Sequence, residues 1–101
     1  MSGMIEPEAC REMTEVRAGV DALDEQIVTL LGKRMRFMEA AARIKVRRED
    51  VRDEARKAAV IANVRAVAAQ SGFPPSLAAQ LYETLVEASI AYELERFDCR
   101  S

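Results

Sequence analysis

Residues 16–45, VRAGVDALDEQIVTLLGKRMRFMEAAARIK, decide the fold that we predict. Apolar side chains recur every three or four residues along this stretch, which is the spacing of one face of an α-helix. The apolar positions are Val16, Val20, Leu23, Ile27, Leu30, Leu31, Met35, Met38, Ala41, Ala42 and Ile44. Gly19 and Gly32 interrupt the pattern, but a single glycine costs a helix only about 1 kcal/mol. We therefore expect one long helix from about residues 7–14 to about residues 45–48.

A second helix is expected to start near Asp50 as its N-cap, with Asp53 and Glu54 in the first turn. Gly72 should end it, because Phe73-Pro74-Pro75 follows and a glycine before prolines is a strong stop signal. A third helix should begin at Pro75 or Ser76 and run to about Phe97. Its expected apolar face consists of Leu77, Leu81, Leu85, Ala88 and Tyr92, widened by Val86 and Ile90. The sequence thus predicts one all-α domain of three helices over residues 1–101.

The composition excludes several classes of function. Fifteen basic and 17 acidic residues give a net charge of −2, without the basic excess of a nucleic-acid-binding protein. The chain has no histidine, and its cysteines, Cys10 and Cys99, lie far apart, so we expect no metal site and no Ser-His or Cys-His nucleophile. No apolar run approaches the roughly 20 residues of a membrane helix, and the first 12 residues lack a secretory signal. We expect a cytoplasmic protein that acts without cofactors.

The length of the first helix predicts a partner chain. About 32 residues at 1.5 Å each give roughly 48 Å. A compact domain of 100 residues has a radius of gyration near 13 Å, so it is only about 30–35 Å across. The apolar face persists to both ends of the helix, so a second copy should cover it. We expect an intertwined homodimer.

Cations interrupt the apolar face of the first helix. Arg34 and Lys45 are 11 residues apart, which places them within about 20° of one direction and roughly 16 Å apart, with the small Ala41 between them. This arrangement indicates a pocket for a small anion, although both side chains could instead reach solvent or pair with acids of another helix. Arg17 lies roughly 25 Å from Arg34 along the helix axis and points about 100° away. It would serve the pocket of a partner chain, or be a solvated surface residue.

Polar residues of the other two helices allow a functional or an ordinary interpretation. Arg56 and Lys57 fit a solvated helix face. Ser89 and Glu93 form an i, i+4 pair flanked by apolar residues. A helical serine often bonds only its own backbone, and Glu93 could pair with Arg96.

Together these residues resemble a known family. The run from Val16-Arg17 through Asp21-x-x-Asp24-x-x-Ile27, Leu30-Leu31-Gly32-Lys33-Arg34-Met35 and Ala41-Ala42-Arg43-Ile44-Lys45 is similar to the first helix of the all-helical, type II chorismate mutases. The likeness continues through Asp53, Arg56, Gly72-Phe73-Pro74 and Ser89-x-x-x-Glu93, so that it covers about residues 12–95. The chain also resembles the related isochorismate-pyruvate lyases, which the loop length between Lys45 and Arg56 matches more closely.

The resemblance implies an intertwined dimer with two equivalent sites for a small dicarboxylate. Arg17 would enter from the partner chain and bind one substrate carboxylate. Arg34 would bind the enolpyruvyl carboxylate. Lys45 would donate a hydrogen bond to the ether oxygen, and Glu93 would be the second donor to that oxygen.

Three further residues receive roles from the resemblance. Arg56 would bind a carboxylate, Asp53 would lie near the ring hydroxyl, and Ser89 would line the pocket. Two positions depart from the common pattern. Many mutases have a glutamate where this chain has Lys57, and many family members have glutamine where it has Glu93. A carboxylate cannot donate a hydrogen bond, so Glu93 would have to be protonated to act as a donor.

The first functional hypothesis is chorismate mutase. The rearrangement of chorismate to prephenate is pericyclic, so it requires a held conformer and stabilised charge on the ether oxygen rather than a nucleophile, metal or base. Glu93 favours the mutase, whereas the loop length and Lys57 favour isochorismate-pyruvate lyase, which gives salicylate and pyruvate. A third alternative is a non-catalytic helical dimer that serves as an interaction module or ligand sensor.

Overall fold

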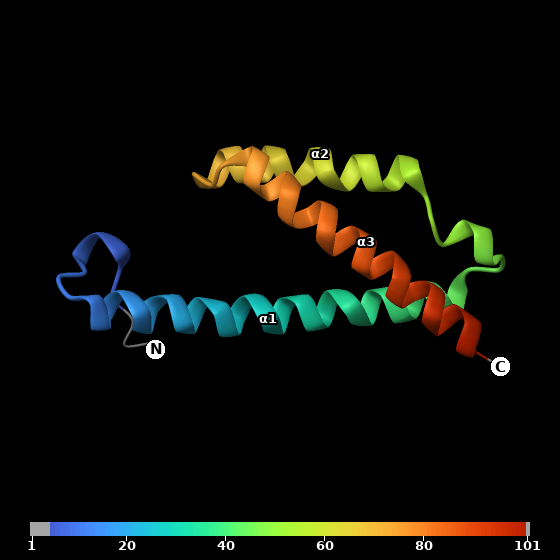
Figure 1. The fold of residues 1–101 in the computed structure, drawn as a ribbon, viewed down its shortest axis with the longest axis horizontal. Helices are drawn as coiled ribbons and strands as arrows, with labels where there is room; N and C mark the ends of the chain where they lie inside the picture. The colour runs from blue at the N-terminus through green and yellow to red at the C-terminus, as the bar shows by residue number, and fades with distance from the viewer. Residues whose placement is uncertain (1–4, 101) are drawn as a thin grey trace. The chain divides into compact units, whose positions relative to one another are not determined.

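The chain is all-helical, as predicted, in a computed structural model that describes residues 5–100. The elements are the short 3-10 helices η1 (Pro7–Ala9) and η2 (Arg48–Asp50) and the α-helices α1 (Met13–Ile44), α2 (Glu54–Ser71) and α3 (Pro75–Cys99). Residues 5–100 contain no strand, and none of their helices is long and apolar enough to cross a membrane. The chain divides into a first unit, Met1–Arg36, and a second unit, Phe37–Ser101. Figure 1 shows α1 as one continuous helix that contributes to both units.

The start of α1 at Met13 lies at the late end of the predicted range. Residues 7–9 form η1, which is separate from α1. The Glu15 carboxylate accepts hydrogen bonds from the backbone N–H groups of Arg11, at 2.7 Å, and Glu12, at 3.1 Å. These contacts satisfy N–H groups beside the helix start that no helical carbonyl can reach. The first turn of α1 is therefore fixed by its own acidic residue.

The prediction that Asp50 caps α2 is wrong, because the N-cap is Asp53. Asp53 has extended backbone angles, and its Oδ1 accepts the backbone N–H of Arg56 at 2.9 Å. Asp50 ends η2 instead and pairs with Arg47 at 3.1 Å. Val51, only 3% exposed, lies between the two aspartates. Burial of this valine draws the chain into the core for one turn before α2 begins.

The hairpin of α2 and α3 forms where the sequence predicts a helix stop. Gly72 has φ 74°, in the left-handed region that glycine adopts at no steric cost. The Phe73 N–H donates to the carbonyl of Ala68 at 2.9 Å, which closes the end of α2. Pro75 then opens α3 at its first position, where its missing N–H has no helical partner to lose. Figure 1 shows the chain reversing here in the second unit.

The core of the second unit differs from the predicted apolar face of α3. Val51, Val86 and Ile90 form the buried cluster, and partly buried side chains pack against it: Val60, Tyr82, Leu94 and Phe97. Leu77 and Leu81, which we expected on the buried face, are 40% and 56% exposed. Apolar residues surround most of α3, so spacing alone does not select the face that meets α2 and η2. The observed inner face consists of Ala78, Val86, Ser89, Ile90 and Glu93.

Candidate active site around Lys45 and Glu93

The second unit brings Lys45 and Glu93 together. Lys45 directly follows α1, whereas Glu93 projects from the buried face of α3. The Lys45 Nζ lies 2.8 Å from the Glu93 Oε2, and the two side chains are 30% and 5% exposed. The sequence left open whether Lys45 reaches solvent or pairs with an acid of another helix, and the structure shows the pair. Glu93 pairs with Lys45 and not with Arg96.

One oxygen of the buried Glu93 carboxyl group lacks a hydrogen-bond donor among the described residues. This oxygen, Oε2, has almost no solvent-accessible area. It lies 2.8 Å from the Lys45 Nζ without hydrogen-bond geometry, so it has no hydrogen-bond partner among the described residues. Buried polar atoms in proteins are nearly always hydrogen-bonded, and an exception requires an explanation. This oxygen is paired with the Lys45 ammonium by charge. A hydrogen-bond donor of a ligand, such as a hydroxyl group, would supply the missing hydrogen bond.

Ser89 lies one helical turn before Glu93 on the same face. It is 2% exposed, and its hydroxyl donates to the Leu85 carbonyl at 2.7 Å. This is the backbone bond that a helical serine commonly makes. The oxygen of a hydroxyl retains acceptor capacity while its hydrogen is donated. Ser89 can therefore present a hydroxyl oxygen as a hydrogen-bond acceptor beside Glu93.

A tyrosine and a glutamate join the last turns of α1 to α3. The Tyr92 hydroxyl donates a hydrogen bond to the Glu39 carboxylate across the two helices. That bond, together with partial burial, raises the pKa of Tyr92, so the phenol stays protonated at neutral pH. Glu39 is six residues before Lys45, and Tyr92 directly precedes Glu93. The contact thus holds the two elements that carry the ion pair.

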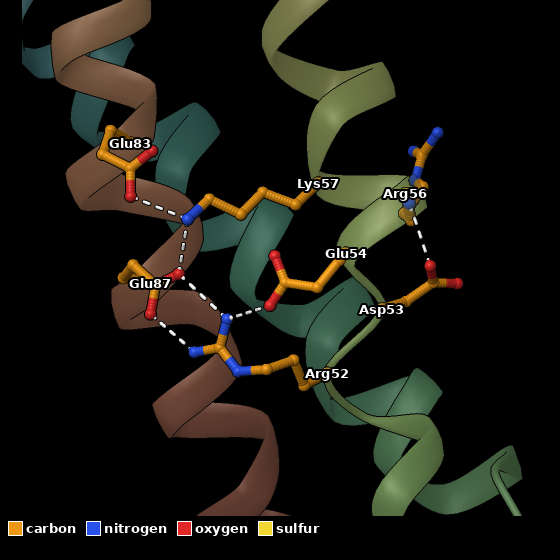
Figure 2. A network of polar contacts seen from close by, with 7 residues as sticks. All are labelled: Arg52, Asp53, Glu54, Arg56, Lys57, Glu83 and Glu87. Carbon is orange, nitrogen blue, oxygen red and sulfur yellow. Dashed lines mark hydrogen bonds and ion pairs between the residues drawn. The ribbon is translucent and has the colours of Figure 1, made fainter.

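Asp53 and Arg56 lie at the start of α2, as Figure 2 shows. Asp53 acts as the N-cap, which is a structural role that the sequence did not assign to it. The Arg56 side chain is exposed, and within residues 5–100 its guanidinium has no ion-pair partner. Arg56 is therefore available to bind a ligand carboxylate. Its expected role, like that of Asp53 toward a hydroxyl, stays a prediction.

Lys57 is held in an ion-pair network instead of extending into solvent. Its Nζ lies 2.7 Å from both Glu83 and Glu87 of α3, and its side chain is 18% exposed. Glu87 also accepts from Arg52, at 2.6 and 3.1 Å, and Arg52 reaches Glu54 at 2.9 Å (Figure 2). These five residues bind the N-terminal end of α2 to α3.

The network shifts the pKa values of its members. Hydrogen bonds from Arg52 and then Lys57 lower the pKa of Glu87 to about 2. Hydrogen bonds to Glu83 and Glu87 raise the pKa of Lys57. Lys57 and Glu87 therefore stay charged at neutral pH. Because Lys57 is engaged on both sides, it behaves as part of the scaffold.

Arg17 and Arg34 both lie in α1, within the first unit. Arg17 is exposed, and its guanidinium has no ion-pair partner in the part of the chain that the structure describes. Arg34 is partly buried and takes part in a polar interaction. Their predicted distribution between two sites rests on the helical spacing.

Sequence reasoning missed the residues that support the site. Tyr92 was assigned to an apolar face, whereas Glu39 and the Glu83–Glu87 pair were not singled out. The four-residue spacing of Glu83 and Glu87 was the available signal, since it places two carboxylates on one side of α3. Nothing in the sequence around Glu39 marks its partner, because Tyr92 is 53 residues away.

Comparisons with known proteins identify the family. The family described as Chorismate mutase type II matches residues 16–94. The chain is also similar to isochorismate pyruvate lyase of Pseudomonas aeruginosa, with 27% identity over 89 residues that cover 88% of each chain. The matched segment contains α2, Lys45 and Glu93, together with nearly all of α1 and most of α3. The chain belongs to the type II chorismate mutase family.

Proposed function

We propose that the protein is a chorismate mutase, which rearranges chorismate to prephenate. The observation that carries this proposal is the Lys45–Glu93 pair, in which a cation meets a buried carboxyl oxygen that lacks a hydrogen-bond donor. An ether oxygen that gains negative charge as its C–O bond breaks would be stabilised by the Lys45 ammonium. Glu93 would add a hydrogen bond to that oxygen only in its protonated form, because a carboxylate cannot donate one. A preplaced cation stabilises developing charge without reorganising.

The remaining residues would hold the substrate in its reactive conformer. Arg34 would bind the enolpyruvyl carboxylate and Arg56 another carboxylate, because a guanidinium matches the planar geometry of that group. Ser89 would line the pocket, and Asp53 would lie near the ring hydroxyl. The reaction is intramolecular, so orientation alone supplies a large part of the rate enhancement.

The site would be completed in a homodimer. Apolar side chains along α1 remain exposed in the single chain, among them Leu23 at 46%, Ile27 at 51% and Leu30 at 65%. A continuous exposed apolar surface of this kind is typical of an interface. A second copy would cover it and would bring its Arg17, which is exposed and without an ion-pair partner among residues 5–100, to the substrate carboxylate.

The second candidate is isochorismate-pyruvate lyase. It is favoured by the similarity to the Pseudomonas aeruginosa protein of that name and by the basic Lys57. Both substrates are dicarboxylates with an enolpyruvyl ether, so the same cations would bind either. Glu93 remains the residue that favours the mutase.

One preparation should be assayed for the consumption of chorismate and of isochorismate, with product identification. We expect a higher kcat/KM for chorismate, with prephenate as product. Faster consumption of isochorismate, with salicylate and pyruvate formed, would establish the lyase instead. Saturable binding without turnover of either compound would indicate a ligand sensor and reject both enzymes.

A further inference from the structure

The C-terminal end of α1 has no glycine to cap it. An α-helix leaves its last carbonyl groups without helical donors, and many helices end on a glycine that lets the chain turn back and satisfy them. Here α1 ends at Ile44, and the residues that follow it are Lys45 and Val46, neither of which is a glycine. The Lys45 N–H still donates to the Ala41 carbonyl at 2.9 Å. The carbonyls that follow need donors from elsewhere in the chain.

Arg100, the residue that follows α3, supplies these donors. Its Nη1 donates to the carbonyls of Ala42, at 2.9 Å, and Lys45, at 2.6 Å, and lies 3.5 Å from that of Arg43. Its Nη2 donates to the Val46 carbonyl at 3.4 Å. The positive charge also suits the negative end of the helix dipole. One guanidinium thus caps a helix more than 50 residues earlier in the chain.

The guanidinium is itself held in place by an aromatic ring. It stacks 3.7 Å from the centroid of Phe97, which packs against the buried cluster of the second unit. This contact adds a cation–π interaction and fixes the plane of the fork. Arg100 therefore joins the end of α1 to the core and does not form an isolated surface bond.

The contacts of Arg100 converge on Lys45. The Lys45 N–H is bound by Ala41, its carbonyl by Arg100, and its side chain by Glu93. Glu93 lies in the C-terminal part of α3, and Arg100 directly follows that helix, seven residues later. The C-terminal end of α3 and the residue after it thus hold Lys45 at its ammonium group and at its backbone.

We propose that Arg100 is a positioning residue that fixes the Lys45 backbone so that its ammonium reaches the reacting oxygen. This proposal rests on the function proposed above. Catalytic groups must be held within about 0.5 Å of their working geometry. Loss of the cap makes the backbone around Lys45 more mobile. It does not replace any of the residues that are proposed to contact the substrate.

The test compares Arg100→Met, Arg100→Lys and the control Arg48→Met. Methionine keeps an apolar stem on Phe97 without donors, whereas lysine keeps the charge and N–H donors without the fork. Arg48 is a matched control, because it is also exposed and binds α3 through Asp98 at 2.8 Å, whereas among residues 5–100 its guanidinium donates to no carbonyl of α1. The measurements are kcat, KM and hydrogen exchange of the backbone amides of residues 42–46.

We expect kcat to fall about 30-fold in Arg100→Met and about 3–10-fold in Arg100→Lys, with KM within threefold, as for a misplaced catalytic group. Exchange at residues 42–46 should accelerate in Arg100→Met and stay unchanged in Arg48→Met. Equal kcat in Arg100→Met and Arg48→Met would overturn the proposal. If Arg100→Met does not fold, a kcat of Arg100→Lys within twofold of the unmodified protein would do so.

Failure of the proposed function would be distinct from failure of this inference. An unmodified protein that turns over neither substrate refutes the activity, and hydrogen exchange then tests the cap alone. Unchanged exchange at residues 42–46 in Arg100→Met refutes the cap whether or not the protein is an enzyme.

Discussion

At the scale of single residues, the ion pair of Lys45 and Glu93 contributes to the stability of the fold as well as to the proposed activity. Removing one partner of a buried pair costs about 3–5 kcal/mol, because the other charge loses its compensation. Lys45 is 30% exposed, so solvent reduces that cost here. A substitution at either position therefore changes stability together with activity, and the two effects must be separated.

Lys45→Ala should lower kcat by about 10²–10³-fold, the effect of removing one donor to a developing oxyanion. It should also lower the Tm, because Glu93 is left without its cation. The double variant Lys45→Ala/Glu93→Gln should recover Tm without recovering kcat. Steady-state assays and thermal unfolding by circular dichroism measure both. A single variant with the unmodified kcat would refute the site.

Glu93→Gln tests whether this position acts as a hydrogen-bond donor. A carboxylate cannot donate a hydrogen bond, whereas a glutamine amide can. We expect the variant to keep its turnover, because the amide can donate to the ether oxygen in place of the carboxyl group. Steady-state assays of the two proteins are the measurement. Loss of turnover in the variant would show that the position does not act through a hydrogen-bond donor.

The sequence predicted the chemistry of these residues better than their contacts. Lys45 and Glu93 were selected by their match to the family pattern, and the structure brings them together. Their support could not be predicted from local sequence. Arg100 and Tyr92 act on α1 residues 53–58 positions away, so their partners depend on how α3 crosses α1.

At the scale of elements, the start of α2 shows why helix boundaries resist prediction. Asp50 and Asp53 are equally good N-caps in composition, three residues apart. The choice is made by Val51, whose burial in the core places the chain in η2 before α2 can begin. By contrast, Gly72 was predicted correctly, because a left-handed C-terminal residue followed by proline is a local signal.

The network around Glu87 should make the attachment of α2 to α3 sensitive to acid. The pKa of Glu87 is lowered to about 2, so its stabilising effect is complete above its ordinary value near 4.5 and is lost as pH falls toward 2. We expect Glu87→Gln to have a lower Tm than the unmodified protein at pH 7. That difference should shrink below pH 4.5 and with added salt, because the pairs are partly exposed.

Glu83→Gln is the matched control for Glu87→Gln, since within residues 5–100 Glu83 pairs with Lys57 alone, whereas Glu87 pairs with Lys57 and Arg52. It should lower Tm by a smaller amount. Thermal unfolding from pH 7 to pH 2.5 measures the whole series. A Tm difference for Glu87→Gln that stays constant over this range would contradict the assigned ion pairs.

At the scale of the whole molecule, the exposed apolar face of α1 is the feature that a single chain leaves unexplained. Val20, Leu23 and Ile44 are 49%, 46% and 74% exposed, and all three belong to the apolar pattern that predicted the helix. The three-helix fold is confirmed, whereas the homodimer stays a prediction. Sequence periodicity identifies an apolar face, but it does not distinguish a face that packs within the chain from one that meets a partner.

Mixing two inactive variants tests the composite site and the dimer together. If each site takes Arg17 from one chain and Lys45 from the other, Arg17→Ala and Lys45→Ala homodimers are both impaired at both sites. A mixed dimer contains one chain of each variant, arranged as in the C2-symmetric homodimer. One of its sites carries both defects, and the other carries neither. Random assembly makes about half of the dimers mixed, so co-refolded chains should recover about a quarter of the unmodified activity.

This recovery requires exchange of chains and complementary defects, so additive residual activity cannot mimic it. The Arg34→Ala and Lys45→Ala pair is the control, because both residues are expected to serve the same site from one chain. If Arg34 and Lys45 of a site come from one chain, each site of their mixed dimer lacks one of the two side chains. A site with both side chains intact would form only if the two residues came from different subunits. We therefore expect recovery with Arg17→Ala and none with Arg34→Ala. Recovery in the control, or none in the test, would contradict the assignment of Arg17 to the partner's site.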